Sequence, residues 1–230
     1  MQHQKDESFN DTGLIVAAAG SGSRFCGKGN KLLQDLSGLP VICHTLKNLL
    51  HNIDPENSVL LVPPGLEEDF RQVISQINKE ESITVLPGGA CRSETVLKGL
   101  RSLPPNVKIA AIQDGARPFT SAALLYKCVV SAREKGSGVA ARRVTDTIKR
   151  ATNEGCVIDT PDRATLWAAE TPQVFQRNLI QQAYETATAN QLAVTDDAQV
   201  LEAAGHKVYL VEHNEKNRKI TYKQELVSQQ

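Results

Sequence analysis

Short apolar runs alternate with helix-type patterns through the first half of the chain. Four runs of apolar or β-branched residues, each ended by Gly, Pro or Asp, predict strands at residues 13–18, 58–62, 82–86 and 107–112. Helical spacing or helix-start signals between and after these runs predict helices behind Pro40, behind Gly65, over 93–102 and over 120–135. Such alternation buries a mostly parallel sheet between two layers of helices. The sequence therefore predicts a Rossmann-like α/β fold.

The alternation stops after residue 136. Residues 137–160 contain β-prone pieces separated by turn residues and have no helical stripe. We interpret them as an inserted β-arm, after which the chain returns to the sheet. Helices near 176–188 and 196–204, a strand near 207–211 and a short terminal helix are then predicted. A chain of 230 residues fits one α/β domain, so we expect residues 1–230 to form a single domain with a mixed, mostly parallel sheet.

Composition excludes several classes of protein. Lys plus Arg and Asp plus Glu both number 26, so no bulk basic field attracts nucleic acid or an anionic membrane, and any anion site must be local. The apolar run LIVAAA is too short for a signal peptide or a membrane span. Five widely spaced cysteines without a CxxC pair argue against a zinc site or a disulfide scaffold. We expect a cytoplasmic protein.

A glycine-rich turn, GSGSRFCGKGNK, directly follows the first predicted strand. In open α/β sheets, anionic ligands bind at this end of a strand. The turn does not fit a dinucleotide site, because Phe25 stands where the third glycine of GxGxxG should be. It does not fit a P-loop either, because Gly29 replaces the hydroxyl residue after GxxxxGK. A plain flexible turn remains an alternative, but Arg24 and Lys31 in the same segment favour an anion site.

A series of motifs resembles one family throughout the chain. The segments AAAGSGSRF, LSGLPVICHTL, PGGACRSETVLKGL, IQDGARPF, VTDTIKR, DRATLWAAETPQ, TDDAQVLEAAG and NRKIT occur in the order typical of 2-C-methyl-D-erythritol 4-phosphate cytidylyltransferases. They extend from about residue 13 to residue 221. Two departures are Ala17, where the family commonly has Pro, and Asn30 before Lys31, where it has a Pro-Lys pair. Both affect the stiffness of the loop and leave its cations in place.

The resemblance implies transfer of CMP from CTP to a sugar-alcohol phosphate, with release of pyrophosphate. Attack on the α-phosphorus brings two anions together, so cations must lie on both substrates. The family pattern assigns Arg24 and Lys31 to the triphosphate. Two unit charges at ~4 Å in an effective dielectric of ~20 attract by roughly 4 kcal/mol, equivalent to about a thousandfold in rate. The chemistry needs no covalent nucleophile, so we assign no catalytic Cys or His.

The resemblance also implies the nucleotide pocket and a divalent cation. Mg²⁺ is expected to arrive with CTP. Asp114 is the candidate to bind the ion, its water or the ribose, although it can equally cap the turn that follows it. The pocket residues implied by the family pattern surround the base and the phosphates, and are Ala18, Ala19, Gly20, Gly22, Gly88, Gly89, Ser93 and Ala116. Gly88 and Gly89 also fit an ordinary strand-to-helix turn, and Arg92 beside them fits a solvated charge.

The acceptor needs anchors of its own. By resemblance, Arg163 and Lys219 position the acceptor phosphate, and Thr147 and Arg117 assist. The β-arm leaves strand edges and apolar surface that a two-fold partner can cover, so we expect a homodimer formed through it. Two alternatives stay open: a ribitol 5-phosphate cytidylyltransferase, and an inactive nucleotide-binding module that keeps the fold.

Overall fold

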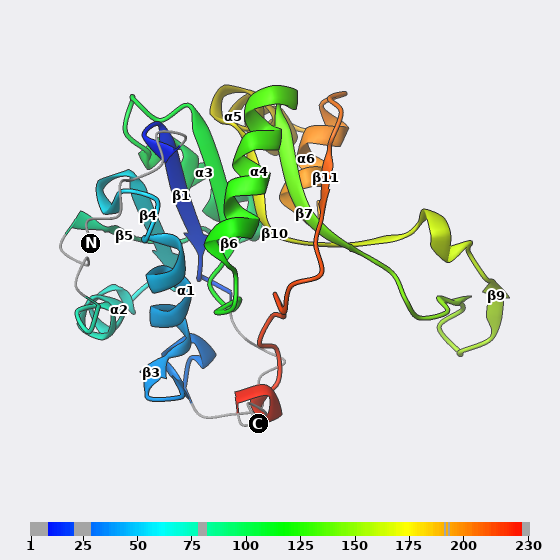
Figure 1. Ribbon diagram of the computed structural model, residues 1–230, viewed down its shortest axis with the longest axis horizontal. Coiled ribbons are helices and arrows are strands. Elements are labelled where there is room, and N and C mark those ends of the chain that lie inside the picture. The colour runs from blue at the N-terminus through cyan, green and yellow to red at the C-terminus, as the bar shows by residue number, and fades with distance from the viewer. Residues whose placement is uncertain (1–8, 21–28, 78–81, 191, 193, 227–230) are drawn as a thin grey trace.

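The structure, a computed structural model, describes residues 9–20, 29–77, 82–190, 192 and 194–226. Its centre is a seven-stranded sheet (Figure 1). In spatial order the strands are β11 (Leu210–Glu212), β7 (Ser137–Arg143), β10 (Trp167–Gln176), β6 (Ile109–Asp114), β1 (Thr12–Ala17), β4 (Ser58–Val62) and β5 (Thr84–Pro87). Strand β10 runs antiparallel to β6 and β7, and the other pairs are parallel. The predicted mixed, mostly parallel sheet is confirmed.

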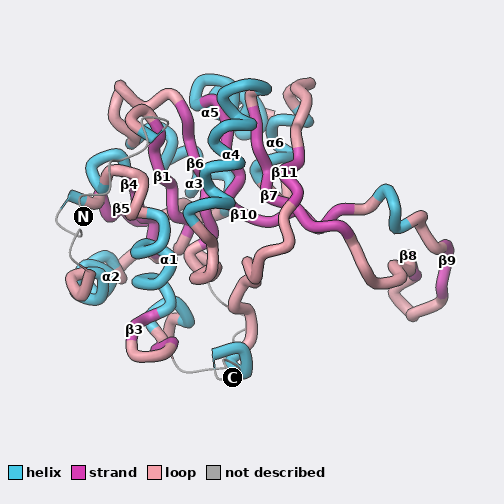
Figure 2. Tube along the Cα trace, in the orientation of Figure 1, coloured by secondary structure: helices cyan, strands magenta, loops and turns pink. Residues whose placement is uncertain are grey.

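Helices cover both faces of this sheet (Figure 2). They are α1 (Val41–Leu49), α2 (Glu67–Ile74), α3 (Arg92–Ser102), α4 (Ala122–Lys135), α5 (Arg177–Ala189) and α6 (Asp197–Ala203). Side chains alternate between the faces along a strand. Leu14 and Val16 of β1 therefore pack with α1, α2 and α4, whereas Ile15 packs with α3, α5 and α6.

Helix α4 shows how the local sequence sets the length of an element. The Ser121 side chain accepts a hydrogen bond from the Leu124 amide at 3.0 Å, which satisfies one of the free N–H groups at the helix start. Gly136 ends the helix with φ 92°, a left-handed conformation that favours glycine. The chain turns there and enters β7 directly.

The predicted elements agree with the structure to within a few residues, with two differences. The strand near 207–211 is confined to Leu210–Glu212, and the terminal helix is a 3-10 turn, Lys223–Leu226. No bounds were predicted for β10, and β7 was predicted as part of the inserted arm. Several short elements were also not predicted from the sequence: β2 (Asp35–Leu36), β3 (Leu39–Pro40) and the 3-10 turns Lys31–Leu33, Pro55–Asn57 and Arg163–Thr165. Each is too short to produce a periodic pattern.

The segment between β7 and β10 projects from the body of the protein (Figure 1). The predicted arm, residues 137–160, overlaps β7, whose first five residues are buried in the sheet. The projecting part therefore begins only after Arg143, and it contains a small two-stranded hairpin, β8 (Arg150–Ala151) and β9 (Val157–Asp159). Three apolar side chains on it are exposed, Ile148, Val157 and Ile158.

Candidate active site

A cavity of about 470 Å³ lies where β1, β5 and β6 end. Ala17 to Gly20 form one wall, directly after the buried part of β1. Gly89 to Arg92 form a second wall at the start of α3, and Asp114 to Ala116 lie at the end of β6 and just after it. The cavity thus occupies the edge at which open α/β sheets bind their ligands.

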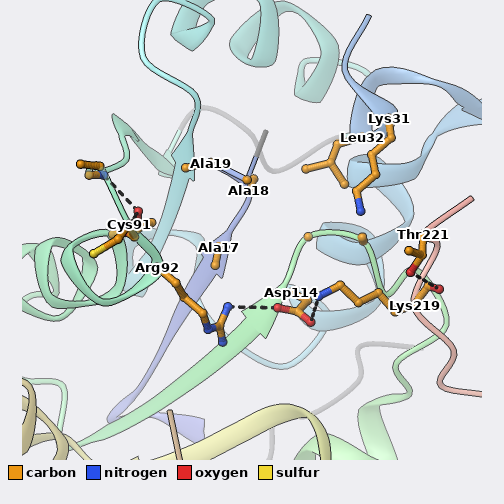
Figure 3. A pocket seen from close by; sticks show the side chains of 16 residues that line it. Ala17, Ala18, Ala19, Lys31, Leu32, Cys91, Arg92, Asp114, Lys219 and Thr221 are labelled. Carbon is orange, nitrogen blue, oxygen red and sulfur yellow. Dashed lines mark hydrogen bonds and ion pairs between the residues drawn. The ribbon is translucent and has the colours of Figure 1, made fainter. Parts of the chain in front are cut away.

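Asp114 is the centre of charge in the cavity. Its carboxylate accepts hydrogen bonds from Arg92 at 3.1 Å and from Lys219 at 2.8 Å (Figure 3). Arg117 Nε lies 3.6 Å from the same carboxylate. Burial acts to raise the pKa of Asp114, but the charges of Arg92 and Lys219 outweigh it and the pKa is lowered. The carboxylate is therefore ionised at neutral pH and holds cations from two distant parts of the chain together.

Arg92 is held by a second carboxylate as well. Its Nη2 donates to Asp197 at 2.5 Å, and the Tyr184 hydroxyl donates to the other oxygen of Asp197, also at 2.5 Å. Burial alone would lower the pKa of Arg92, but Asp197 and Asp114 together raise it, so the guanidinium stays charged. The sequence interpretation of Arg92 as a solvated charge is wrong, because Arg92 forms ion pairs with Asp114 and Asp197. Asp197 is distant in the sequence, so no local pattern indicates this pair.

Lys31 forms part of another wall of the cavity. It begins the 3-10 turn Lys31–Leu33, in which the Asn30 side chain accepts a hydrogen bond from the Leu32 amide at 2.9 Å. Its Nζ donates to the Ile220 carbonyl at 3.1 Å, and the side chain points toward the cavity (Figure 3). The predicted residues Gly22 and Arg24 lie outside the described residues.

The structure brings only some of the predicted pocket residues near the start of α3 to the cavity. Gly89 lines the cavity, but Gly88 and Ser93 are not among its lining residues. Thr95, which the sequence analysis missed, does line it: its hydroxyl accepts from the Gly89 amide at 3.0 Å and donates to the Cys91 carbonyl at 2.8 Å. A helical register that begins at Arg92 turns residue 95, rather than 93, back toward the loop.

Gly88 contributes by allowing a close approach. A Cβ at this position would lie 2.3 Å from the Cβ of Ala19, so only glycine lets the two walls meet. We expect Gly88→Ala to lower the free energy of unfolding by about 1–3 kcal/mol, because the overlap forces the backbone to move. Urea denaturation measures this. Gly20→Ala is the control, since nothing lies within 4 Å of its added Cβ, and equal midpoints for the two variants would contradict the prediction.

Three predicted acceptor residues lie outside the lining of the cavity. Arg117 is buried behind Asp114, and its Nη1 donates to the Asn217 carbonyl at 2.7 Å. Thr147 and Arg163 are exposed on the projecting segment, where Arg163 donates to the Thr145 carbonyl at 2.9 Å. Of the predicted acceptor residues, Lys219 alone is among the described residues that line the cavity.

The described residues offer no ready-made metal centre. Among them, no cluster of three His, Cys, Asp or Glu side chains could hold an ion. Asp114 is the acidic residue among those that line the cavity, and both its oxygens already accept from cations. A divalent ion would therefore depend on oxygens supplied by a ligand.

The arrangement suits a ligand that has several negative charges. Lys31, Arg92 and Lys219 approach one cavity from three directions, and small residues leave room for a flat group against the backbone. Fixed cations of this kind stabilise charge that develops on phosphate oxygens during transfer.

The sequence model of the family described as 2-C-methyl-D-erythritol 4-phosphate cytidylyltransferase matches residues 13–230. The chain belongs to this family. An enzyme of that name from Synechococcus elongatus is 39% identical over 212 residues, which cover 90% of each chain. One from Alkaliphilus oremlandii is 34% identical over 223 residues, covering 96% of this chain and 94% of the relative.

Solved structures of the 2-C-methyl-D-erythritol 4-phosphate cytidylyltransferase family agree with this fold. The 4-diphosphocytidyl-2C-methyl-D-erythritol synthase of Anaerococcus prevotii has a TM-score of 0.80 at 28% identity, over 94% of both chains. The cytidylyltransferase of Francisella tularensis has a TM-score of 0.79 at 26% identity, over 94% of this chain and 97% of that one. The resemblance inferred from the motifs is thereby confirmed.

Proposed function

We propose that this protein transfers CMP from CTP to 2-C-methyl-D-erythritol 4-phosphate, giving 4-diphosphocytidyl-2-C-methyl-D-erythritol and pyrophosphate. The observation that supports it most is the match to this family from residue 13 to residue 230, together with three cations around one cavity at the sheet edge. The acceptor phosphate oxygen attacks the α-phosphorus of CTP directly and in line. Pyrophosphate leaves from the opposite side.

The cations divide between the two substrates. Arg24 and Lys31 neutralise the triphosphate and the charge that builds on the leaving pyrophosphate. Lys219, together with Arg163, holds the acceptor phosphate. The backbone of Ala18, Ala19, Gly20 and Gly89 lies against the cytidine. Electrostatic stabilisation and positioning together lower the barrier, and no covalent intermediate forms.

Magnesium is expected to enter as its complex with CTP. Phosphate oxygens would supply most of its ligands, because Asp114 is the acidic side chain among the described residues that line the cavity. When bound, the ion neutralises part of the triphosphate charge.

The test of this function is pyrophosphate release with CTP and one acceptor at a time. We expect release with 2-C-methyl-D-erythritol 4-phosphate at a kcat/KM far above that with ribitol 5-phosphate. A preference for ribitol 5-phosphate would reassign the acceptor. No release with either acceptor would favour an inactive nucleotide-binding module.

We also propose a homodimer formed through the projecting segment. Exposed Ile148, Val157 and Ile158 on this segment offer apolar surface for a partner. The positions of Thr147 and Arg163 support the same proposal, because neither lines the cavity of its own protomer. In a two-fold dimer each segment can reach toward the other protomer, which would bring Arg163 to the partner's acceptor site.

Sedimentation equilibrium checks the dimer. We expect the mass of two chains at micromolar concentration, and we expect Val157→Asp/Ile158→Asp to shift the protein toward the monomer, because charged side chains resist burial in the interface. The control replaces exposed Lys47 of α1 and Glu68 of α2 with Asp; these helices lie away from the projecting segment (Figure 1), so the mass should not change. A wild-type monomer at this concentration would exclude the segment as a dimer element.

A cytoplasmic location is proposed as well. The five cysteines are widely spaced in the sequence and contain no CxxC pair, which fits a reducing compartment. In the part of the chain that the structure describes, no helix is both long and apolar enough to cross a bilayer.

A further inference from the structure

The C-terminal segment that contains Lys219 crosses the edge of the cavity and is fastened to it at several points. The Ile220 amide donates to the Ala116 carbonyl at 2.8 Å, and the Ile220 carbonyl accepts from Lys31 at 3.1 Å. Ahead of Lys219, the Asn217 carbonyl accepts from Arg117 at 2.7 Å. Lys219 therefore projects from a short stretch of backbone that is fixed on both sides.

The side chain of Asn217 also holds this segment in place, through hydrogen bonds to three other residues. Its side chain is almost fully buried, and Nδ2 donates to Glu170 Oε2 at 2.9 Å and to the Thr171 carbonyl at 2.8 Å. Its Oδ1 accepts from the Thr120 hydroxyl at 2.7 Å. Both donors and the carbonyl of the amide are thus satisfied inside the protein, at a point two residues before Lys219.

The partners of Asn217 are the same elements that hold Asp114 and the projecting segment. Thr171 Oγ1 accepts from the Asp114 amide at 3.0 Å, so β10 supports both the carboxylate and the segment of its partner Lys219. Glu170 also accepts from Arg142 Nε at 2.7 Å and lies 3.4 Å from Arg117. Arg142 is in the last part of β7, where the projecting segment leaves the sheet.

We propose that Asn217 is a positioning residue for the transfer reaction: by joining Glu170, Thr171 and Thr120 it fixes the backbone from which Lys219 reaches Asp114 and the acceptor. This inference rests on the proposed function, in which Lys219 holds the acceptor phosphate. A lysine side chain has a long, flexible stem, so its ammonium is well placed only if its backbone is fixed. A misplacement of about 1 Å at a reacting group can cost about a hundredfold in rate.

The test compares two buried asparagines. We expect Asn217→Ala to lower kcat/KM for 2-C-methyl-D-erythritol 4-phosphate about tenfold or more, while the dissociation constant of CTP, measured by calorimetry without acceptor, changes less than about twofold. Asn57→Ala is the matched control, because Asn57 is also buried but lies beside β4, in the turn Pro55–Asn57. Kinetics that are equal in the two variants, with similar melting temperatures, would overturn the inference.

A milder pair of substitutions covers the case in which Asn217→Ala does not fold. Thr120→Val removes the hydroxyl that donates to Asn217, whereas Thr120→Ser retains it. We expect Thr120→Val to raise the KM for the acceptor and Thr120→Ser to keep the wild-type value. A wild-type KM for the acceptor in both Thr120 variants would contradict the proposed role of Asn217.

A double variant separates this inference from the function on which it rests. If Asn217 acts through Lys219, adding Asn217→Ala to Lys219→Met causes little further loss. Losses that multiply would show that Asn217 acts independently, and would overturn the inference alone. If Lys219→Met by itself left acceptor kinetics unchanged, the assignment of Lys219 in the proposed function would fail, and the role of Asn217 would fail with it.

Discussion

Replacing Lys219 with Met is expected to lower kcat/KM for 2-C-methyl-D-erythritol 4-phosphate by about a hundredfold to a thousandfold. Methionine keeps much of the apolar stem and removes the charge. An interaction of roughly 4 kcal/mol between unit charges at ~4 Å is equivalent to about a thousandfold in rate, of which the part gained in the transition state counts. Asp114 keeps Arg92 at 3.1 Å, so the variant should fold. Steady-state kinetics with varied acceptor measure the effect.

The same loss is expected for Arg163→Met, by a different route. Arg163 lies on the projecting segment, outside the cavity of its own protomer, so the proposed dimer brings it to the partner's acceptor. Mixing Arg163→Met with Lys31→Ala, each nearly inactive alone, should restore activity, because one site of the mixed dimer then contains both residues. An Arg163 that serves its own cavity would give no recovery on mixing.

Calorimetric titration with CTP is the control for both acceptor variants. Binding of CTP without acceptor should change far less than acceptor kinetics, because Arg24 and Lys31 remain. A variant that lost CTP affinity and kept its affinity for the acceptor would show that these cations belong to the nucleotide.

Lys31→Ala is expected to lower kcat by up to about a thousandfold, because the lost charge stabilises mainly the transition state. Lys31 is only partly buried and donates a hydrogen bond to the Ile220 carbonyl, so the free energy of unfolding should fall by only about 1 kcal/mol. Arg24→Ala should have the same kinetic effect. Turnover at saturating CTP and acceptor measures it.

The exposed Lys47 of α1 provides the comparison. Lys47→Ala removes the same charge outside the cavity lining and should leave kcat unchanged. Wild-type turnover in Lys31→Ala would exclude a transition-state role for that residue, whatever its effect on the KM for CTP.

The strands and helices before residue 136 that contain five or more residues or lie at a predicted apolar run could be predicted from sequence, because each has its own local pattern of buried apolar residues. The run at 58–62 coincides with β4, and the start of α1 follows Pro40, as predicted. The boundary of the arm could not be read in this way. Residues 137–141 are buried because they pair with β10 in the sheet, and β10 lies beyond the arm in the sequence. Pairing between distant strands has no local signature.

The residues of the candidate site likewise differ in whether a local motif could predict them. Lys31, Asp114 and Lys219 lie in motifs next to strand ends or in a motif typical of the family, and all three line the cavity. The role of Arg92 escaped sequence reasoning because it depends on Asp197, which becomes its partner only when α6 packs near α3. Thr95 was missed because one residue of helical register decides which side chain faces the loop.

The position of β10 between β6 and β7 also constrains the order in which a nascent chain can fold. Strands β6 and β7 are consecutive in the sequence but are not neighbours in the sheet. During synthesis, one edge of β6 stays unpaired until Trp167–Gln176 has been made. Until then β7 also lacks the strand that joins it to β6. The four strands β5, β4, β1 and β6 can assemble first, with the backbone N–H and C=O groups along the free edge of β6 left unpaired until β10 is added.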